Sequence, residues 1–279
     1  MQVNSLQPAS GQEQRSNLRD ILDGLSTQLR VIRALILRET MTRYGEHKLG
    51  FLWAFVEPIL MVLIISLIFQ FIRNTQPGGM PVIPFLITGF VPFAIFRDTM
   101  SQTQSAISQN AMLVGFPQVS TFDVIVARAL LELAVLLSVL TIMLWGTGIF
   151  GFEVRCEKPL QLLAACLMLC MTALGFGFIF ASLSPLIPSI RQLSAQVLGR
   201  PLFLASGVIF VVERFPPKIR DIVLYNPLLH MIELVRSSYF YEFESSHASW
   251  TYAGSWAFGI LAFGMLVHQV MHKRAMVGL

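Results

Sequence analysis

The amino-acid sequence predicts an all-helical integral membrane protein, and three observations lead to this fold class. Hydrophobic residues make up 54% of the 279 residues and charged residues only 13%, which is too apolar for a soluble chain of this length. The net charge of +4 is small and mostly terminal, so it indicates membrane orientation rather than nucleic-acid binding. The apolar residues form runs long enough to cross a bilayer, and we place six spans at 52–72, 82–106, 124–152, 159–183, 193–212 and 250–271.

The segment before the first span divides into two parts. Residues 1–25 are polar and lack the apolar core of a signal peptide, and we expect them to be disordered. From 26 to 44 the apolar residues lie on one side of a helical wheel and Arg30, Arg33 and Arg38 on the other. Such a helix is too short and too charged to span, so we predict that it lies in the lipid headgroup layer. An ordinary cytosolic helix packed on a partner is the alternative.

Few charges interrupt the spans themselves. The first span contains Glu57, and the fifth contains Arg200; a charge inside a span usually faces the bundle interior or water. The second span continues into a polar helical tail around Arg97. In the third span Arg128 and Glu132 are one helical turn apart, a spacing that lets them pair with each other.

The distribution of lysine and arginine predicts the orientation. Several basic residues precede the first span, and Lys273 and Arg274 follow the last one. With six spans both termini share a side, which we place in the cytoplasm. The segment 213–249 is then external, and its helical stripe after Asn226-Pro227 predicts one or two short helices that dip into the outer leaflet.

Two connectors invite a functional interpretation. On the external segment, His230 and Glu233 lack a third ligand and a HExxH motif, so we predict no metal site and no catalytic role. On the cytoplasmic side, residues 110–123 contain an exposed apolar knuckle between polar flanks. Such an exposed apolar segment indicates contact with a protein partner or the membrane surface. A simple turn without a partner is the alternative.

Several function classes find no support in the motifs. No lysine follows a glycine, so the chain has no P-loop and cannot bind ATP by that device. The G-x-S-x-G motif is absent, as are paired intramembrane acids with nearby histidines, so a membrane enzyme has no residues to assign. A gradient-driven transporter would need ionisable pairs at mid-membrane or broken helices in matching halves, and we find no internal repeat.

Four stretches, in this order, resemble the type-2 ABC exporter permeases: TRYGEHKLGFLWAFVEPI, NAMLVGFP, the proline-flanked loop 183–191 and NPLLHMIELVR. More narrowly, the chain resembles the inner-membrane permease of bacterial capsular polysaccharide exporters. The resemblance runs from about residue 27 to the end and preserves order and spacing.

The resemblance implies a homodimer of six-span subunits in the bacterial inner membrane, with both termini cytoplasmic. It implies two separate ATP-binding cassette subunits that bind ATP and Mg²⁺, so that this chain binds no cofactor. A lipid-linked polysaccharide is the implied substrate, with periplasmic and outer-membrane export proteins as further partners. A permease for O-antigen or another glycolipid is the alternative.

The resemblance also implies site residues. It places the segment that receives the ATPase stroke on Met112, Leu113, Val114, Gly115, Phe116, Pro117, Gln118 and Val119. It places the outer gate helices within 214–240, with the candidate residues Asn226, Pro227, His230, Glu233 and Arg236.

A path for sugar chains favours aromatic walls, and an anionic head group favours basic residues. Our candidates for these two roles are Arg38, Arg43, Lys48, Phe51, Trp53, Phe55, Glu57, Arg200, Phe203 and Phe210. Lipid-facing or packing roles are the alternative for each aromatic ring. Two roles stay open for Glu57: a fixed acid that faces the dimer seam, or the cap of a helix that restarts at Pro58.

Overall fold

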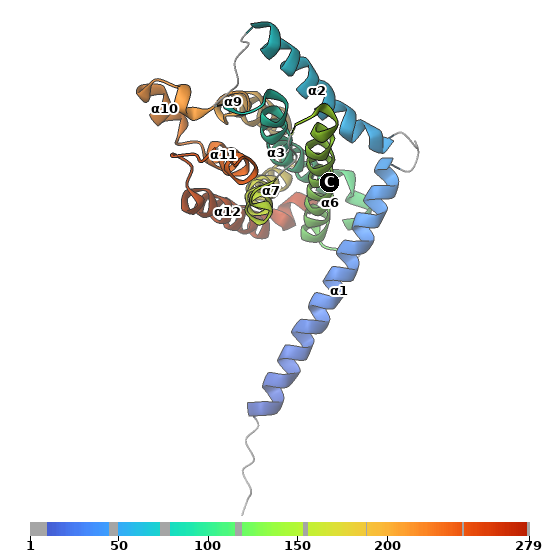
Figure 1. The fold of residues 1–279 in the computed structure, drawn as a ribbon. Coiled ribbons are helices and arrows are strands. Elements are labelled where there is room, and N and C mark those ends of the chain that lie inside the picture. Colours follow the sequence, from blue (N-terminus) through green and yellow to red (C-terminus); the bar gives the residue numbers. More distant parts are fainter. Residues whose placement is uncertain are drawn as a thin grey trace, which may run out of the picture.

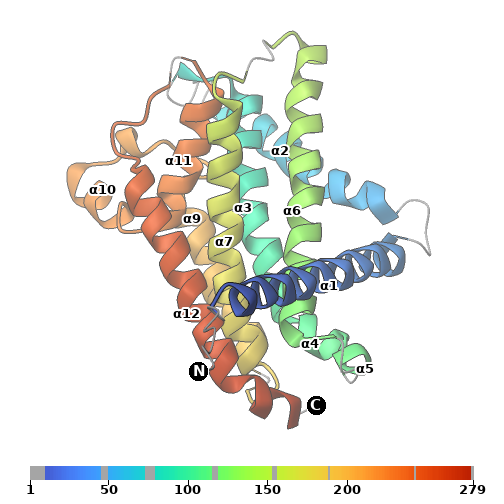
Figure 2. The same cartoon turned by 90° about the horizontal axis from the view of Figure 1, so that it is seen from below.

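Four long helices stand side by side in the computed structural model, which describes residues 10–44, 50–72, 79–114, 119–152, 156–187, 189–241 and 243–277. They are α3 (Val82–Gln104), α6 (Thr121–Gly146), α7 (Pro159–Leu183) and α12 (Trp250–Val277), seen end-on in Figure 1 and upright in Figure 2. Within the described residues, these four helices contain segments that are long and apolar enough to cross a membrane. All regular structure in this part of the chain is helical, which confirms the all-helical prediction.

Helix α7 lies at the centre of the bundle, against α12, α3 and α11 (Pro227–Tyr239), while α6 packs on the other side of α3. Glycines allow α7 and α12 to approach closely. A Cβ built on Gly264 would lie 2.2 Å from the carbonyl oxygen of Gly175, and one on Gly175 would lie 2.6 Å from the carbonyl oxygen of Ile260. Any larger residue at this crossing would collide with backbone, which cannot move aside as a side chain can.

Helix α2 (Gly50–Ile72) lies beside α3 at the edge of the bundle, and it runs unbroken through Pro58. The hypothesis that a helix restarts at Pro58 with Glu57 as its cap is therefore wrong. A long apolar helix tolerates the loss of the single backbone hydrogen bond that proline removes. One side of α2 is open to its surroundings, with exposed leucine and isoleucine side chains such as Leu60, Ile64 and Leu67.

Helix α1 (Ser10–Tyr44) crosses one end of the bundle and projects well beyond it (Figures 1 and 2). This is the orientation that a helix in the headgroup layer would take. Residues 10–25, which we predicted to be disordered, are helical, whereas residues 1–9 lie outside the described part. Elongation of a helix that is already docked adds one hydrogen bond per residue fixed, so a polar extension can remain helical.

Short helices connect the long ones. Helices α4 (Ala106–Gln109) and α5 (Ala111–Val114) follow α3 at the end of the bundle that α1 crosses, and η2 (Thr147–Phe150) extends α6 at the opposite end. Helix α6 begins with a capping box, in which Ser120 and Asp123 satisfy each other's backbone N–H groups.

The predicted fifth span, 193–212, is not one continuous helix. The chain forms α8 (Ile190–Ser194), a π-helical turn η3 (Ala195–Gly199) and α9 (Arg200–Ala205), and then it turns at Gly207, whose φ is +71°. Glycine takes this left-handed conformation without the steric cost that a Cβ would add. The short helices η4 (Val212–Arg214) and α10 (Pro217–Val223) follow before α11.

Helix α11 differs from the predicted surface helix, because it is buried among α3, α7 and α12. Every residue from Leu228 to Arg236 is buried. The polar residues among them are buried because each has hydrogen-bond partners inside the protein. These partners lie in other segments of the chain, so the periodicity of the helix does not predict them.

Candidate functional site

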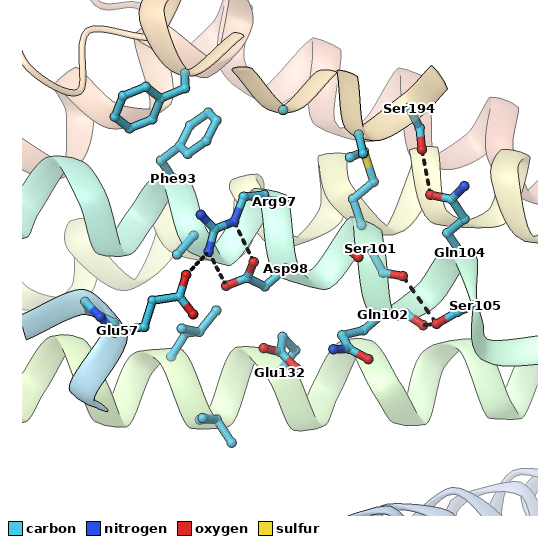
Figure 3. A pocket seen from close by; sticks show the side chains of 18 of the residues that line it. Glu57, Phe93, Arg97, Asp98, Ser101, Gln102, Gln104, Ser105, Glu132 and Ser194 are labelled. Carbon is cyan, nitrogen blue, oxygen red and sulfur yellow. Dashed lines mark hydrogen bonds and ion pairs between the residues drawn. The ribbon is translucent and has the colours of Figure 1, made fainter. Parts of the chain in front are cut away.

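A cavity of about 1140 Å³ opens between α2, α3, α6 and the α8–α9 segment (Figure 3). Helix α3 forms its long wall, and the character of this wall changes along the helix. Aromatic residues come first, a cluster of charges follows, and hydroxyl and amide side chains line the end nearest α4. The cavity therefore has three zones, which we call the aromatic, ionic and polar zones.

The aromatic zone is built around Phe203 of α9, which packs against two phenylalanines of α3. Its ring centroid lies 5.4 Å from that of Phe90 and 5.3 Å from that of Phe93, in tilted and edge-on arrangements. Trp53 and Met61 of α2 line the same cavity from the opposite side. Aromatic faces bind apolar ring surfaces without requiring a fixed hydrogen-bond geometry.

The ionic zone centres on Arg97. Its Nε and Nη2 donate to the two carboxylate oxygens of Asp98 at 2.7 and 3.2 Å, and Nη2 also donates to Glu57 of α2 at 3.2 Å (Figure 3). The fork of hydrogen bonds to Asp98 fixes the plane of the guanidinium group. Among the described residues, Glu57 is thus the only residue of α2 that bonds to this cluster. Its side chain is 71% exposed.

The polar zone lies where α3 meets α8. The Ser194 hydroxyl donates to Oε1 of Gln104 at 2.8 Å. Arg191 borders the zone and donates to Ser184 at 2.6 Å and to Ser108 at 2.5 Å. Further polar residues line the cavity here: Ser101, Gln102, Ser105 and Gln109.

Two ion pairs join α1 to α6 beside the cavity. Arg43 donates to Glu132 at 2.5 Å, and Arg128 donates to Glu39 at 2.8 Å. The prediction that Arg128 and Glu132 pair with each other is therefore wrong. Both residues lie on the face of α6 that α1 covers, where a partner on the second helix is available to each.

Four of the predicted path residues line the cavity: Arg43, Trp53, Glu57 and Phe203. Three others lie elsewhere. Arg38 donates to Asn110 at 2.9 Å, Phe55 packs against the main core, and Phe210 makes an edge-on contact with Phe215. Lys48 and the side chains of Phe51 and Arg200 lie outside the described residues.

The predicted ATPase-coupling segment begins in α5, at the end of the bundle that α1 crosses (Figure 2). Met112 is 91% exposed, whereas Val114 and Val119 are partly buried against a small core cluster. Leu113 is partly buried, and residues 115–118 lie outside the described part. The hydrogen bond from Arg38 to Asn110 ties α1 to the start of α5.

The residues predicted for an outer gate hold α11 to its neighbours. Asn226 caps the helix by accepting from the Leu228 N–H at 3.0 Å, and Pro227 occupies the first turn. His230 contacts the Leu224 carbonyl oxygen at 2.8 Å. Arg236 is fully buried and donates to the carbonyl oxygens of Gly207, Val208 and Phe210.

Burial also shifts the ionisable groups of α11. Desolvation lowers the pKa of Arg236 to about 10, so the guanidinium stays charged at neutral pH. Desolvation raises the pKa of Glu233 above its ordinary value, although hydrogen bonds from Ser245 and from the Val212 N–H oppose this shift. Among the described residues, no group of three His, Cys, Asp or Glu side chains could hold a metal ion.

Sequence reasoning missed much of the cavity. Arg97 and Asp98 were visible as charges at the end of an apolar run, which is a signal for a functional group inside a membrane protein. Gln104 and Ser194 carried no such signal, because they are 90 residues apart in the chain and meet only in the folded protein.

Comparisons with known proteins identify relatives over most of the chain. It is 33% identical to the capsule polysaccharide export inner-membrane protein CtrC of Neisseria meningitidis over 221 residues, which cover 78% of this chain and 82% of CtrC. It is 30% identical to the polysialic acid transport protein KpsM of Escherichia coli over 253 residues, 90% of this chain and 96% of KpsM. A more distant relative is the O-antigen export system permease protein RfbA of Klebsiella pneumoniae, at 21% identity over 70% of this chain and 74% of RfbA.

A family model agrees with these relatives. The model for the ABC-2 type transporter membrane domain matches residues 30–240, which include α2, α3, α6, α7 and α11. The chain therefore belongs to the ABC-2 type transporter family of membrane proteins.

Proposed function

We propose that this chain is the membrane-spanning permease subunit of an ATP-driven exporter that moves lipid-linked capsular polysaccharide across the bacterial inner membrane. The observation that carries the proposal is the three-zone cavity of about 1140 Å³. A sugar ring has apolar faces and polar edges, and the cavity offers aromatic faces and hydrogen-bonding groups along one wall. The relatives named for capsule polysaccharide and polysialic acid export support the same substrate class.

The energy for export comes from a separate partner. Two ATP-binding cassette subunits bind ATP and Mg²⁺, and they contact the permease at α5 and the segment that follows it. The exposed Met112 and the Arg38–Asn110 hydrogen bond support this location, because they place an apolar contact and a polar tie to α1 at the same end. The chain itself catalyses no reaction.

The working unit is a homodimer with six spans in each subunit and both termini in the cytoplasm. Helix α2 serves as the first span and the α8–α9 segment as the fifth. The open apolar side of α2 supports a dimer contact near the cavity, since such a surface requires lipid or a protein partner. Periplasmic and outer-membrane export proteins receive the polymer beyond the membrane.

A permease for O-antigen or another glycolipid is the second candidate, and the similarity to RfbA supports it. The two candidates share the family and the polymer class, and they differ in the glycan and its lipid anchor. The higher identity and fuller coverage of the capsule relatives favour capsular polysaccharide. A gradient-driven transporter is disfavoured by the family match.

Export by a bacterial strain that lacks its own capsule permease tests the proposal. The chain is expressed with its ATPase partner, and surface polymer is measured by antibody binding to intact cells. We expect polymer on the surface, and a several-fold decrease for Phe203→Ser, which removes the central ring of the aromatic zone. Trp145→Ser is the matched control, because this 76% exposed ring lies outside the cavity. Polymer retained inside cells that contain the assembled complex would contradict the proposal.

A further inference from the structure

The polar zone contains a buried hydrogen-bonding group without a partner. Gln104 is 5% exposed and lines the cavity, and its Nε2 has no hydrogen-bond partner in the part of the chain that the structure describes. Its Oε1 accepts from the hydroxyl of Ser194, which is itself 4% exposed. Turning the carboxamide would only exchange the unpaired donor for an unpaired acceptor. Nε2 itself is enclosed in this conformation, and because an unpaired buried amide is costly, a turn of the side chain toward the cavity would let a ligand complete its hydrogen bonds.

The surroundings of Gln104 define the chemistry of that ligand. The neighbouring lining groups are hydroxyls and amides, including Ser101, Ser105 and Gln109. The two cations that contact this zone already have partners. Arg191, three residues before Ser194, donates to Ser184 and Ser108. Arg128 donates to Ser105 and forms an ion pair with Glu39. A neutral carboxamide beside a serine hydroxyl does not offset the burial of an anion, but it matches two adjacent hydroxyls, each of which can donate and accept.

The local backbone at this end of the cavity departs from a regular α-helix. Ser194 is the last residue of α8, and the π-helical turn of Ala195–Gly199 follows it directly. Such turns are costly distortions that occur frequently at functional sites. On the other side, Ser105 joins α3 to α4, next to the segment that we assign to the ATPase. Arg191 of α8 also donates to Ser108 of α4, so a hydrogen bond joins α4 to the helix that carries Ser194.

We propose that Gln104 and Ser194 form a subsite for adjacent hydroxyls of one uncharged sugar ring, at the end of the cavity nearest α4 and α8. This inference rests on the proposed export function and adds a specific recognition point to it. The subsite holds a ring by its polar edge, whereas the aromatic zone contacts rings by their faces.

Sugar binding to the full-length protein in lipid nanodiscs tests the subsite. Saturation-transfer NMR is recorded with maltotriose, an uncharged sugar with adjacent hydroxyls, and with inorganic phosphate. We expect saturable binding of maltotriose that weakens about tenfold in Gln104→Met, which keeps the shape of the side chain and removes its hydrogen-bonding atoms. Gln161→Met is the matched control, because this exposed glutamine of α7 lies outside the cavity. Ser194→Ala provides a second, smaller change should Gln104→Met fail to fold.

The possible outcomes separate the subsite from the export function. Equal binding of maltotriose by the wild-type protein and by both variants would overturn the subsite and indicate that a water molecule satisfies Gln104. Preferential binding of phosphate, or the absence of maltotriose binding, would also overturn it. The export assay in the strain that lacks its own capsule permease separates the two proposals. Normal export by the wild-type protein and by Gln104→Met would contradict the subsite alone. Failure of the wild-type protein to export would contradict the proposed function.

Discussion

Nη1 of Arg43 on α1 lies 2.5 Å from Oε2 of Glu132 on α6. A second ion pair between the same helices, Glu39 with Arg128, lies one helical turn away. Along α1 the acid Glu39 precedes the base Arg43, whereas along α6 the base Arg128 precedes the acid Glu132. Only one alignment of the two helices satisfies both pairs, because a shift by one turn would bring like charges together. The four residues therefore fix the position of α1 across the bundle.

Charge exchange tests this alignment. Glu132→Arg should lower the thermal stability of the purified protein, because it places three cations at one crossing. Adding Arg43→Glu should recover part of the loss, with a coupling free energy of about 0.5 to 3 kcal/mol in a double-mutant cycle. Thermal unfolding in detergent measures the effect. Additive effects of the two substitutions would show that the pair does not contribute to docking of α1.

Close packing of α7 and α12 predicts a strong effect of a single methyl group. Gly264→Ala would place a Cβ 2.2 Å from the carbonyl oxygen of Gly175, so the helices must separate. We expect a loss of about 1 to 3 kcal/mol in the free energy of unfolding. Gly259→Ala on the same helix is the control, since a Cβ there meets no atom within 4 Å. Similar stability of both variants in thermal unfolding would refute the close crossing.

Glu233 predicts a pH dependence of stability. Burial raises the pKa of this carboxyl above its ordinary 4.5, so the folded protein binds more protons than the unfolded chain between the two values. Stability should therefore decrease as the pH rises from 4.5 through the folded-state pKa, and then stay level. Glu233→Gln should reduce this decrease, whereas Glu244→Gln, an exposed control, should retain it in full. A wild-type protein whose unfolding temperature rises over this range would contradict the assignment.

Met112 tests the proposed contact with the ATPase. The side chain is 91% exposed, so Met112→Glu should change the free energy of unfolding by no more than about 0.5 kcal/mol. It should nevertheless reduce stimulation of the partner's ATPase activity, because a charge replaces an apolar contact. Ile149→Glu, at an 87% exposed position in η2, is the control. Unchanged ATPase stimulation by Met112→Glu would place the contact elsewhere.

The sequence by itself determined the membrane class and the existence of most helices. Apolar runs such as 159–183 and the basic stripe around Arg33 are local patterns, and a helix repeats every 3.6 residues whatever its neighbours are. The order and spacing of the quoted stretches also sufficed to indicate the family, which the match over residues 30–240 confirms.

Only the tertiary structure decided which polar groups meet. Glu57 bonds to Arg97 across 40 residues, and Gln104 bonds to Ser194 across 90, so no local pattern could pair them. The turn at Gly207 within the predicted fifth span is connected to the burial of α11, since Arg236 binds the carbonyl oxygens of the chain that turns there. Hydrophobicity selects segments for the membrane, whereas hydrogen bonds between distant segments decide how those segments enclose a cavity.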